Sequence, residues 1–437
     1  MPSSRRSVLA TASLGIGALA GCVSLDSPEA TGSWPRRMVT NEHTGAGSTD
    51  GPSSDLHTVW QAERPGGLPG PASPVVADGT LYLAYSPDPR VENRGGAWVE
   101  AFDAATGESR WTTELYRTSE DDTFYHSDSL VLDGDRLFVQ TKPGLTMLTT
   151  GGVVEWRFDN LDGGQQAPDV VPPVVTDDVV VTGSFDTQTT DSPVERLYGL
   201  DPATGEQRWR VDFPERVNMW QLSGTDDTVF VPFLGWGLLA IDADTGEERW
   251  RWRGPVEGAV TVTDDRLLVP VNPDDADEGL LALDRSTRSV AWRRSLDPRW
   301  TESCVSVADG RAYCSAVGRV EALDTATGER LWQFGGGFDP DESPTGVPLF
   351  TEETPVVSGS TVYAPGYVQR DTVHGHLFTL DAESGREVGR VELGRNETAM
   401  TSTPAVTSDL VFLNSDDGVM RAFGECSVGA GGRCLVD

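Results

Sequence analysis

An eleven-residue pattern, Ala-x-Asp-x-x-Thr-Gly-x-x-x-Trp, recurs along this chain and constrains its fold more than any other feature. Five copies, some with one pattern residue replaced, keep the aspartate eight residues before the tryptophan: Asp103 and Trp111, Asp201 and Trp209, Asp242 and Trp250, Asp284 and Trp292, Asp324 and Trp332. Two weaker copies have Leu148 in place of the aspartate or Gly389 in place of the tryptophan. Self-similarity at roughly 40 to 55 residues predicts a repeat architecture.

Each copy has the chemistry of a β-hairpin. An apolar run ends in an aspartate that can accept turn amides, and the Thr-Gly that follows supplies the positive φ of a bulged loop. A second hairpin precedes each copy, for example "PVVADGTLYLAY" and "VTVTDDRLLVP". Four strands per unit predict a propeller blade, so the fold class is an all-β propeller. The outermost strands number eight when counted at Trp60, Trp111, Trp156, Trp209, Trp250, Trp292, Trp332 and Gly389.

The two ends of the repeat array are offset in a way that predicts ring closure. Residues 56–64 form an outer strand with no blade before it, and residues 418–425 form a third strand with no outer strand after it. We expect the N-terminal strand to complete the last blade and remove an exposed edge. We expect the repeated tryptophans to pack between blades as core rather than to form an active site.

These repeats resemble those of the pyrroloquinoline quinone (PQQ)-like propeller family across nearly all of residues 56–425. The resemblance implies an eight-bladed propeller. The family includes quinoprotein dehydrogenases and also non-enzymatic lipoproteins, such as the propeller subunit of the bacterial outer-membrane barrel-assembly machine. The repeat is therefore specific for the fold and says little about function.

The N-terminus predicts export and anchoring. Arg5 and Arg6 precede a short apolar stretch that ends in "LAGC" at Cys22, which resembles a twin-arginine signal with a lipobox over residues 1–21. Lipid on the Cys22 thiol would anchor the protein to the outer side of the cell membrane. The alternative is a plain cleaved signal with an incidental cysteine. Residues 22–55 are rich in Ser, Gly, Thr and Pro, which predicts a flexible polar tether.

The charge balance predicts a high-salt environment and argues against nucleic acid as a direct partner. The formal net charge is -34, and Lys142 is the only lysine. Such an acidic, lysine-poor composition is typical of proteins in strong brine, where salt screens self-repulsion. An acidic nucleic-acid mimic is the competing explanation, but the acidic residues are spread over every blade. We expect no direct nucleic-acid partner.

Four cysteines besides Cys22 predict two disulfides in an exported chain. Cys304 and Cys314 flank a tight hairpin, and Cys426 and Cys434 close a glycine-rich loop in the tail of residues 426–437. Neither pair has the further His or Cys that a zinc site requires. The alternative is free buried thiols.

Other chemical candidates are weak. His374 and His376 alternate near the start of a strand and are compatible with a metal or with an ordinary surface. The loop at residues 272–279, which contains Asp274, Asp275, Asp277 and Glu278, lacks the glycine and spacing of a recognised calcium loop. No phosphate loop, nucleophile elbow or metalloprotease helix is present, so no catalytic residue is predicted.

Loop lengths predict which face of the propeller binds. The turns between strands one and two and between strands three and four are short and uniform, whereas the opposite face carries long, varied loops. Side chains next to innermost strands would surround the central opening there: His126, Met219, Trp220, Trp300 and Met400. They form a candidate binding patch. The alternative is that Trp220 and Trp300 cap the core between blades.

Two functions therefore remain open at the level of sequence. The first is a monomeric, membrane-anchored propeller that binds an unidentified surface or membrane protein and has no cofactor and no catalytic activity. The second is a PQQ-dependent oxidoreductase with calcium. The family resemblance implies the second only in part, because the adjacent Cys-Cys pair of the quinoprotein dehydrogenases is absent.

Overall fold

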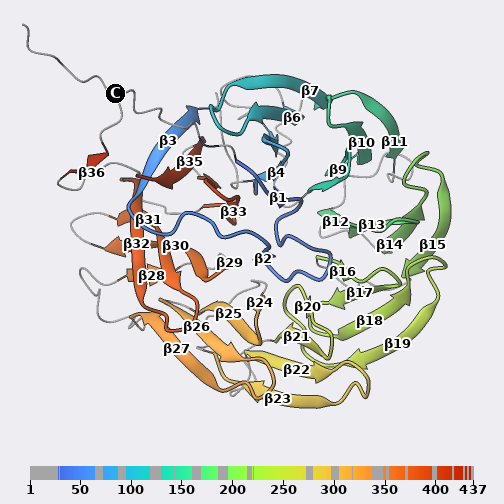
Figure 1. Cartoon of the computed structure of the whole chain (residues 1–437). Helices are drawn as coiled ribbons and strands as arrows, with labels where there is room; N and C mark the ends of the chain where they lie inside the picture. Colours follow the sequence, from blue (N-terminus) through green and yellow to red (C-terminus); the bar gives the residue numbers. More distant parts are fainter. Residues whose placement is uncertain are drawn as a thin grey trace, which may run out of the picture.

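The computed structural model shows an all-β ring of eight four-stranded antiparallel sheets (Figure 1), which confirms the predicted propeller. It describes residues 28, 30–63, 72–86, 95–118, 129–141, 143–159, 169–185, 195–213, 219, 221–271, 279–296, 305–316, 318–336, 348–350, 354–369, 373–395, 401–415, 418–426, 429–430 and 433–434. The described part of the chain contains no helix of the length and hydropathy that a membrane span requires.

The blades follow one another along the chain, each running from an innermost to an outermost strand. Blade 1 contains β4 (Val75–Ala77), β5 (Thr80–Tyr85), β6 (Gly95–Asp103) and β7 (Ser109–Thr118), and blade 2 contains β8 (Leu130–Asp133), β9 (Arg136–Thr141), β10 (Gly144–Thr149) and β11 (Val154–Asp159). Blade 3 contains β12 (Asp169–Val175), β13 (Val180–Phe185), β14 (Glu195–Leu200) and β15 (Gln207–Phe213), and blade 4 contains β16 (Ser223–Gly224), β17 (Thr228–Phe233), β18 (Gly237–Asp242) and β19 (Glu248–Arg253). Blade 5 contains β20 (Thr261–Val262), β21 (Arg266–Pro270), β22 (Leu280–Asp284) and β23 (Val290–Arg294), and blade 6 contains β24 (Ser306–Ala308), β25 (Arg311–Ala316), β26 (Arg319–Asp324) and β27 (Arg330–Gly335). Blade 7 contains β29 (Val356–Ser358), β30 (Thr361–Gln369), β31 (Val373–Asp381) and β32 (Glu387–Arg395), with β28 (Pro348–Phe350) beside β30. Blade 8 contains β33 (Ala405–Val406), β34 (Val411–Asn414), β35 (Val419–Glu425) and β3 (Leu56–Glu63). A separate hairpin joins β36 (Gly429–Ala430) to β37 (Arg433–Cys434).

The repeated aspartate organises the turn between the third and fourth strands. Oδ1 of Asp201 accepts hydrogen bonds from the backbone amides of Ala203 and Thr204 at 3.0 and 2.9 Å and from the Thr204 hydroxyl at 3.2 Å. Gly205 then takes a φ of 71°, which only glycine adopts at little cost. The same contacts recur at Asp103, Asp242 and Asp324, so the first half of the pattern specifies a bulged hairpin turn.

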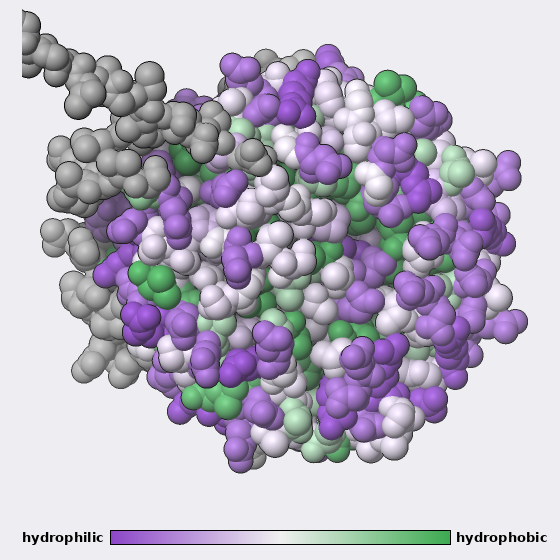
Figure 2. All heavy atoms as spheres, in the orientation of Figure 1, coloured by the Kyte–Doolittle hydropathy of each residue, from purple (hydrophilic) through white to green (hydrophobic). Residues whose placement is uncertain are grey.

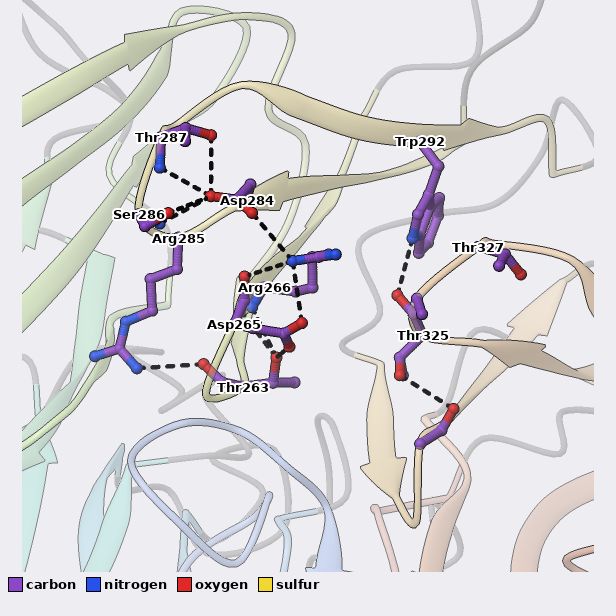
Figure 3. Close-up of polar contacts among 12 residues, drawn as sticks. Thr263, Asp265, Arg266, Asp284, Arg285, Ser286, Thr287, Trp292, Thr325 and Thr327 are labelled. Carbon is purple, nitrogen blue, oxygen red and sulfur yellow. Dashed lines mark hydrogen bonds and ion pairs between the residues drawn. The ribbon is translucent and has the colours of Figure 1, made fainter.

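The repeated tryptophan joins each blade to the turn of the next. The Trp209 indole nitrogen donates to the carbonyl of Ala243 at 2.9 Å, and the ring covers Gly246 of the same turn so closely that a methyl group there would lie 2.6 Å from it. Figure 3 shows the equivalent bond from Trp292 to Thr325. The same bond joins Trp60 to Ala104, Trp111 to Thr150, Trp156 to Pro202 and Trp332 to Ala382. The eleven-residue pattern is therefore an interblade fastener, as its predicted structural role requires.

Two departures from the pattern have a physical explanation. Arg288 replaces the turn glycine beside Trp250, adopts a φ of 61°, and places its guanidinium 5.5 Å from the indole centroid in a cation–π contact. Gly389 replaces the tryptophan of blade 7 because blade 8 has no turn joining its third and fourth strands. Residues 53–54 lie there instead, and a side chain at Gly389 would come 3.1 Å from the Ser53 carbonyl oxygen.

The N-terminal strand closes the ring, as predicted. β3 pairs antiparallel with β35, from Leu56 opposite Glu425 to Glu63 opposite Val419. Chain segments from the two ends of the ring therefore form one blade, which leaves no incomplete sheet.

The segment before β3 was predicted to be a flexible tether, and for residues 30–55 that prediction is wrong. Residues 30–47, hereafter the strap, run around the inside of the ring and contact the innermost strand or first turn of every blade in order (Figure 1). β1 (Ser33–Trp34) pairs with β4, and β2 (Ala46–Gly47) pairs parallel with β29. Between them, strap carbonyls accept amides from the inner strands of the intervening blades: Leu132 to Pro35, Gly224 to Asn41, Val262 to Glu42 and Val307 to Thr44.

The strap is anchored by backbone groups and by a few buried side chains. Trp34 and Met38 are almost fully buried, and Asn41 bonds both the amide and the carbonyl of Val175. Seven of the eight innermost strands are only two to four residues long and leave ladder groups without partners, and the strap supplies partners for them. Its polar composition is therefore compatible with a fixed position, because backbone hydrogen bonds do not depend on side-chain hydropathy.

Candidate functional site

The strap places a cluster of basic side chains at the propeller axis. Arg36 bonds Asn41 and lies 3.5 Å from the His43 ring. The Arg37 guanidinium donates to the Thr403 hydroxyl at 2.9 Å and to Gln221 at 3.1 Å, which links blades 8 and 4 across the ring. Burial together with the neighbouring Arg36 and Arg37 holds the pKa of His43 well below its usual range, so this imidazole is neutral at pH 7.

The strap covers one of the two faces of the ring. We define the turn face as the face with the turns between strands one and two and between strands three and four, and the loop face as the opposite one. The strap bonds the inner strands where they enter the first turn, at residues such as Leu132, Val262 and Val307. It therefore fills the opening on the turn face, and Figure 2 shows side chains occupying the middle of the ring. The strap does not fill the loop face, which is the side to which the sequence assigns the long and varied loops.

A lateral groove of about 510 Å³ lies between the outer parts of blades 3 and 4. Its floor is apolar, with Phe213 and Phe233 in edge-to-face contact at 5.2 Å. Trp252 and Trp236 line it as well, and the Trp236 side chain is 68% exposed. The groove escaped the sequence analysis because residues on two blades form it. The one available signal in the sequence was Trp236 in the turn "LGWG", because the other short turns contain no tryptophan.

Of the five residues predicted to form a binding patch around the loop-face opening, the structure describes only Met219, so the patch as a whole stays a prediction. Met219 is wrongly placed in it: its side chain is fully buried in a core cluster that includes Val179 and Leu222, and its backbone bridges to Phe233. Its unbranched chain fills space between blades 3 and 4, so it belongs to the core. The other four members, His126, Trp220, Trp300 and Met400, lie outside the described residues.

The two cysteine pairs have different outcomes. Cys314 is a free thiol buried in blade 6, which contradicts the predicted bond to Cys304. Because Ser306 pairs with Tyr313, the same register puts Val305 opposite Cys314, and neighbouring residues on a strand point to opposite faces. Cys426 is disulfide-bonded, and its pairing with Cys434 stays a prediction. Cys304, Cys22, Arg5 and Arg6 lie outside the described residues.

The described part of the axis presents basic side chains, and no cluster of carboxylates is found among the described residues. Calcium requires several oxygen ligands, with carboxylates prominent among them. In the described ranges no three His, Cys, Asp or Glu side chains gather as a metal site, and the axis presents guanidinium and imidazole groups. His374 bonds Glu392 at 3.0 Å, and His376 contacts the His374 carbonyl at 2.9 Å. The acidic loop at residues 272–278 lies outside the described part.

Comparison with known proteins agrees with the fold. The family described as "Outer membrane protein assembly factor BamB" matches residues 95–191, 193–316 and 316–425. No curated protein matches the sequence.

Solved structures similar to this chain include enzymes and an assembly factor. Quinohemoprotein alcohol dehydrogenase from Comamonas testosteroni has a TM-score of 0.69 at 14% identity, covering 94% of this chain and 84% of that one. BamB from Moraxella catarrhalis has a TM-score of 0.56 at 19% identity, covering 86% and 99%. A europium-containing methanol dehydrogenase has a TM-score of 0.62 at 12% identity, covering 90% and 98%. At these identities the likeness shows the fold alone.

Proposed function

Because the chain belongs to the family described as outer membrane protein assembly factor BamB, we propose that it is a non-catalytic scaffold that binds a partner protein at the outer side of the cell membrane. The similar solved structures include both a BamB and quinone-type dehydrogenases, so the choice between scaffold and enzyme depends on the site.

One observation carries the proposal: the chain's own strap occupies the axis at the turn face, with its side chains engaged there. Arg36, Arg37 and His43 are engaged with strap and blade residues. Carboxylate oxygens, which a calcium-bound cofactor needs, are not grouped at the described part of the axis. A closed axis leaves the loop face and the interblade surfaces for binding.

The proposal includes attachment to the membrane. Export by the twin-arginine route and lipidation of Cys22 would hold the propeller near membrane proteins, and the residues between Cys22 and the strap would be the linker. Replacing Cys22→Ser should release the protein into the medium. Retention of that variant in the membrane fraction would contradict lipid anchoring.

The test of scaffold function is covalent capture on native membranes. Full-length protein cross-linked in its native membrane at high salt should give one dominant partner at reproducible stoichiometry. The Cys22→Ser protein, added back in solution at equal concentration, should capture the same partner more weakly. Failure of the full-length protein to cross-link to any partner above the level of an unrelated lipoprotein would contradict the scaffold function.

A further inference from the structure

The strap enters the propeller at a defined point on the turn face. The Ser408 backbone amide donates to the Thr31 carbonyl at 2.8 Å, and the hydroxyls of the same two residues lie 2.6 Å apart. Ser408 belongs to the turn between β33 and β34, which is the first turn of blade 8. Ala30 is fully buried in the core cluster that contains Trp34. The chain is therefore held at the turn face from Ala30 onward.

The strap gives no slack to the chain that precedes it. β1 starts at Ser33, and Trp34 pairs with Val76 while its ring is fully buried in the core. A side chain at Gly32 would come 3.3 Å from the Thr49 hydroxyl oxygen, so the segment before β1 is closely packed as well. Releasing this end would cost buried contacts and backbone hydrogen bonds. The point at which the chain leaves the turn face is therefore fixed.

The length of the chain limits the distance from this exit point to Cys22. Eight residue steps separate Cys22 from Ala30. A fully extended chain spans at most about 3.6 Å per residue, so Cys22 lies within about 29 Å of Ala30. The average span of a flexible segment of this length is shorter, on the order of 16 Å. A lipid on Cys22 would therefore bring the bilayer close to the exit point.

The size of a blade decides which face of the propeller can approach that bilayer. Strands lie about 4.8 Å apart and rise about 3.3 Å per residue, so blade 8 extends about 15 Å outward from its first turn, and β3 is about 26 Å long. A chain that brought the loop face to the membrane would have to run about 40 Å over the rim and along the side of the blade. Eight residues cannot cover this distance. An edge-on propeller is within reach only at the rim near blades 8 and 1, whereas the turn face can approach at any tilt.

The composition of the turn face decides what holds it near the membrane. Seven of the eight first turns contain at least one aspartate, for example Asp135 and Asp264. Among the described residues, the turns of this face expose one large hydrophobic side chain strongly, Val153 at 59%. A face of this kind does not insert into a bilayer, so the covalent anchor holds it there. At 1 M salt the Debye length is about 3 Å, so repulsion between these carboxylates and anionic headgroups acts only at short range.

We propose that the strap and the eight residues before it hold the propeller with its turn face toward the lipid bilayer and its loop face away from it. The inference rests on the lipid anchor of the proposed function and adds the orientation that this anchor imposes. The loop face then lies at least about 26 Å from the bilayer, which is the height of a blade. A partner bound at the loop face is therefore contacted through a part that projects from the membrane, not through its membrane-spanning part.

Energy transfer from single dyes on the propeller to a labelled lipid tests the orientation. Asp244→Cys carries a dye on the turn face of blade 4, Trp236→Cys on the loop face of the same blade, and Leu331→Cys on the outer strand of blade 6; all three positions are exposed. Lipidated full-length protein from native membranes is reconstituted at high salt into phosphatidylglycerol vesicles that contain a rhodamine-labelled lipid. A membrane-impermeant thiol dye then labels the outward-facing molecules, and the protein without an added cysteine gives the background.

We expect the transfer efficiency to be highest at Asp244→Cys, intermediate at Leu331→Cys and lowest at Trp236→Cys, because these positions lie progressively farther from the bilayer. A matched variant carries an insertion of about thirty Gly and Ser residues after Ser27, which raises the average span of the segment to on the order of 35 Å. This insertion should lower the transfer at Asp244→Cys and bring the three efficiencies together. Its urea midpoint should match that of the parent, because the strap is unchanged.

Three results would overturn the proposal. Equal efficiencies at Asp244→Cys and Trp236→Cys would indicate an edge-on propeller, and the highest efficiency at Trp236→Cys would indicate the reverse orientation. An unchanged order in the variant with the insertion would show that the segment before the strap does not set the orientation.

Failure of the anchor and failure of the scaffold function give different outcomes. Cys22→Ser should be absent from the vesicles, and if it floats with them as the parent does, the lipid anchor is wrong and the proposal falls with it. If the expected order of efficiencies is found but no partner is captured on native membranes, the orientation stands and only the scaffold function fails.

Discussion

Adding one methyl group to the turn glycine of blade 4 tests the interblade fastener. In Gly246→Ala the new Cβ would lie 2.6 Å from the Trp209 ring, which is 9% exposed and bonded to Ala243. The φ of 71° costs alanine about 1 kcal/mol, and moving a buried, well-packed ring adds about 1 to 3 kcal/mol. We expect a total loss of about 2 to 4 kcal/mol in the free energy of unfolding.

A matched glycine isolates the ring contact. Gly310 has a φ of 74°, but a methyl group there meets no atom within 4 Å, so Gly310→Ala should cost only about 1 kcal/mol. Urea unfolding followed by circular dichroism, at one salt concentration, measures both midpoints and slopes. Adding Trp209→Phe should recover part of the Gly246→Ala loss, because the smaller ring makes room for the methyl group. Equal losses in Gly246→Ala and Gly310→Ala would refute the fastener.

Four further predictions concern the strap, the closure, the turns and the free thiol. Trp34→Ala should cost about 3 to 5 kcal/mol in urea unfolding because the ring is fully buried, whereas a mobile tether would leave the midpoint unchanged. Deleting residues 56–63 should expose the edge of β35 and lower the thermal midpoint markedly; a parental midpoint would contradict the closure. The hydrogen bond from Arg208 lowers the pKa of Asp201 from 3.8 to about 2. An aspartate with a lowered pKa stabilises the fold above pH 4, and this stabilisation is lost as the pH falls toward 2. Between pH 4 and pH 2 the urea midpoint of Asp201→Asn should therefore decrease less steeply with pH than the urea midpoint of the parent protein. Burial raises the pKa of Cys314, so iodoacetamide mapping should label it only after unfolding, and a peptide joining it to Cys304 would contradict the structure.

The sequence predicted the propeller well because each repeat carries its own local chemistry. The aspartate, the positive-φ glycine and the tryptophan each act within a turn or on the adjacent turn, so their spacing alone defines the blade and its neighbour. Ring closure was also predictable, since unpaired strands at residues 56–64 and 418–425 need each other.

The strap was missed for a physical reason. Many of its contacts are backbone hydrogen bonds to inner strands, and such bonds leave no hydropathy pattern. The available signal was the pair of apolar residues Trp34 and Met38, both buried, inside a segment that is otherwise polar. Composition alone therefore could not distinguish a fixed segment from a tether.

Site residues were the least predictable part. Met219 precedes an innermost strand as expected, but the direction of its side chain depends on packing between blades 3 and 4. The prediction of a disulfide between Cys304 and Cys314 was wrong because the register puts Val305 opposite Cys314. A shift of one residue in register turns a side chain to the other face of the sheet. The groove with Trp236 and Arg253 exists only when β15 and the next blade are side by side, so a linear pattern does not reveal it.

Quinone binding is the measurement that separates a scaffold from a dehydrogenase most directly. Full-length protein is equilibrated at high salt with excess PQQ and calcium, freed of unbound quinone, and its absorbance spectrum and dye reduction with alcohols are recorded. The account predicts no retained quinone absorbance and no dye reduction above a heat-unfolded control, because the strap occupies the axis at the turn face. Stoichiometric quinone with alcohol-dependent dye reduction would contradict the scaffold function and identify the chain as an oxidoreductase.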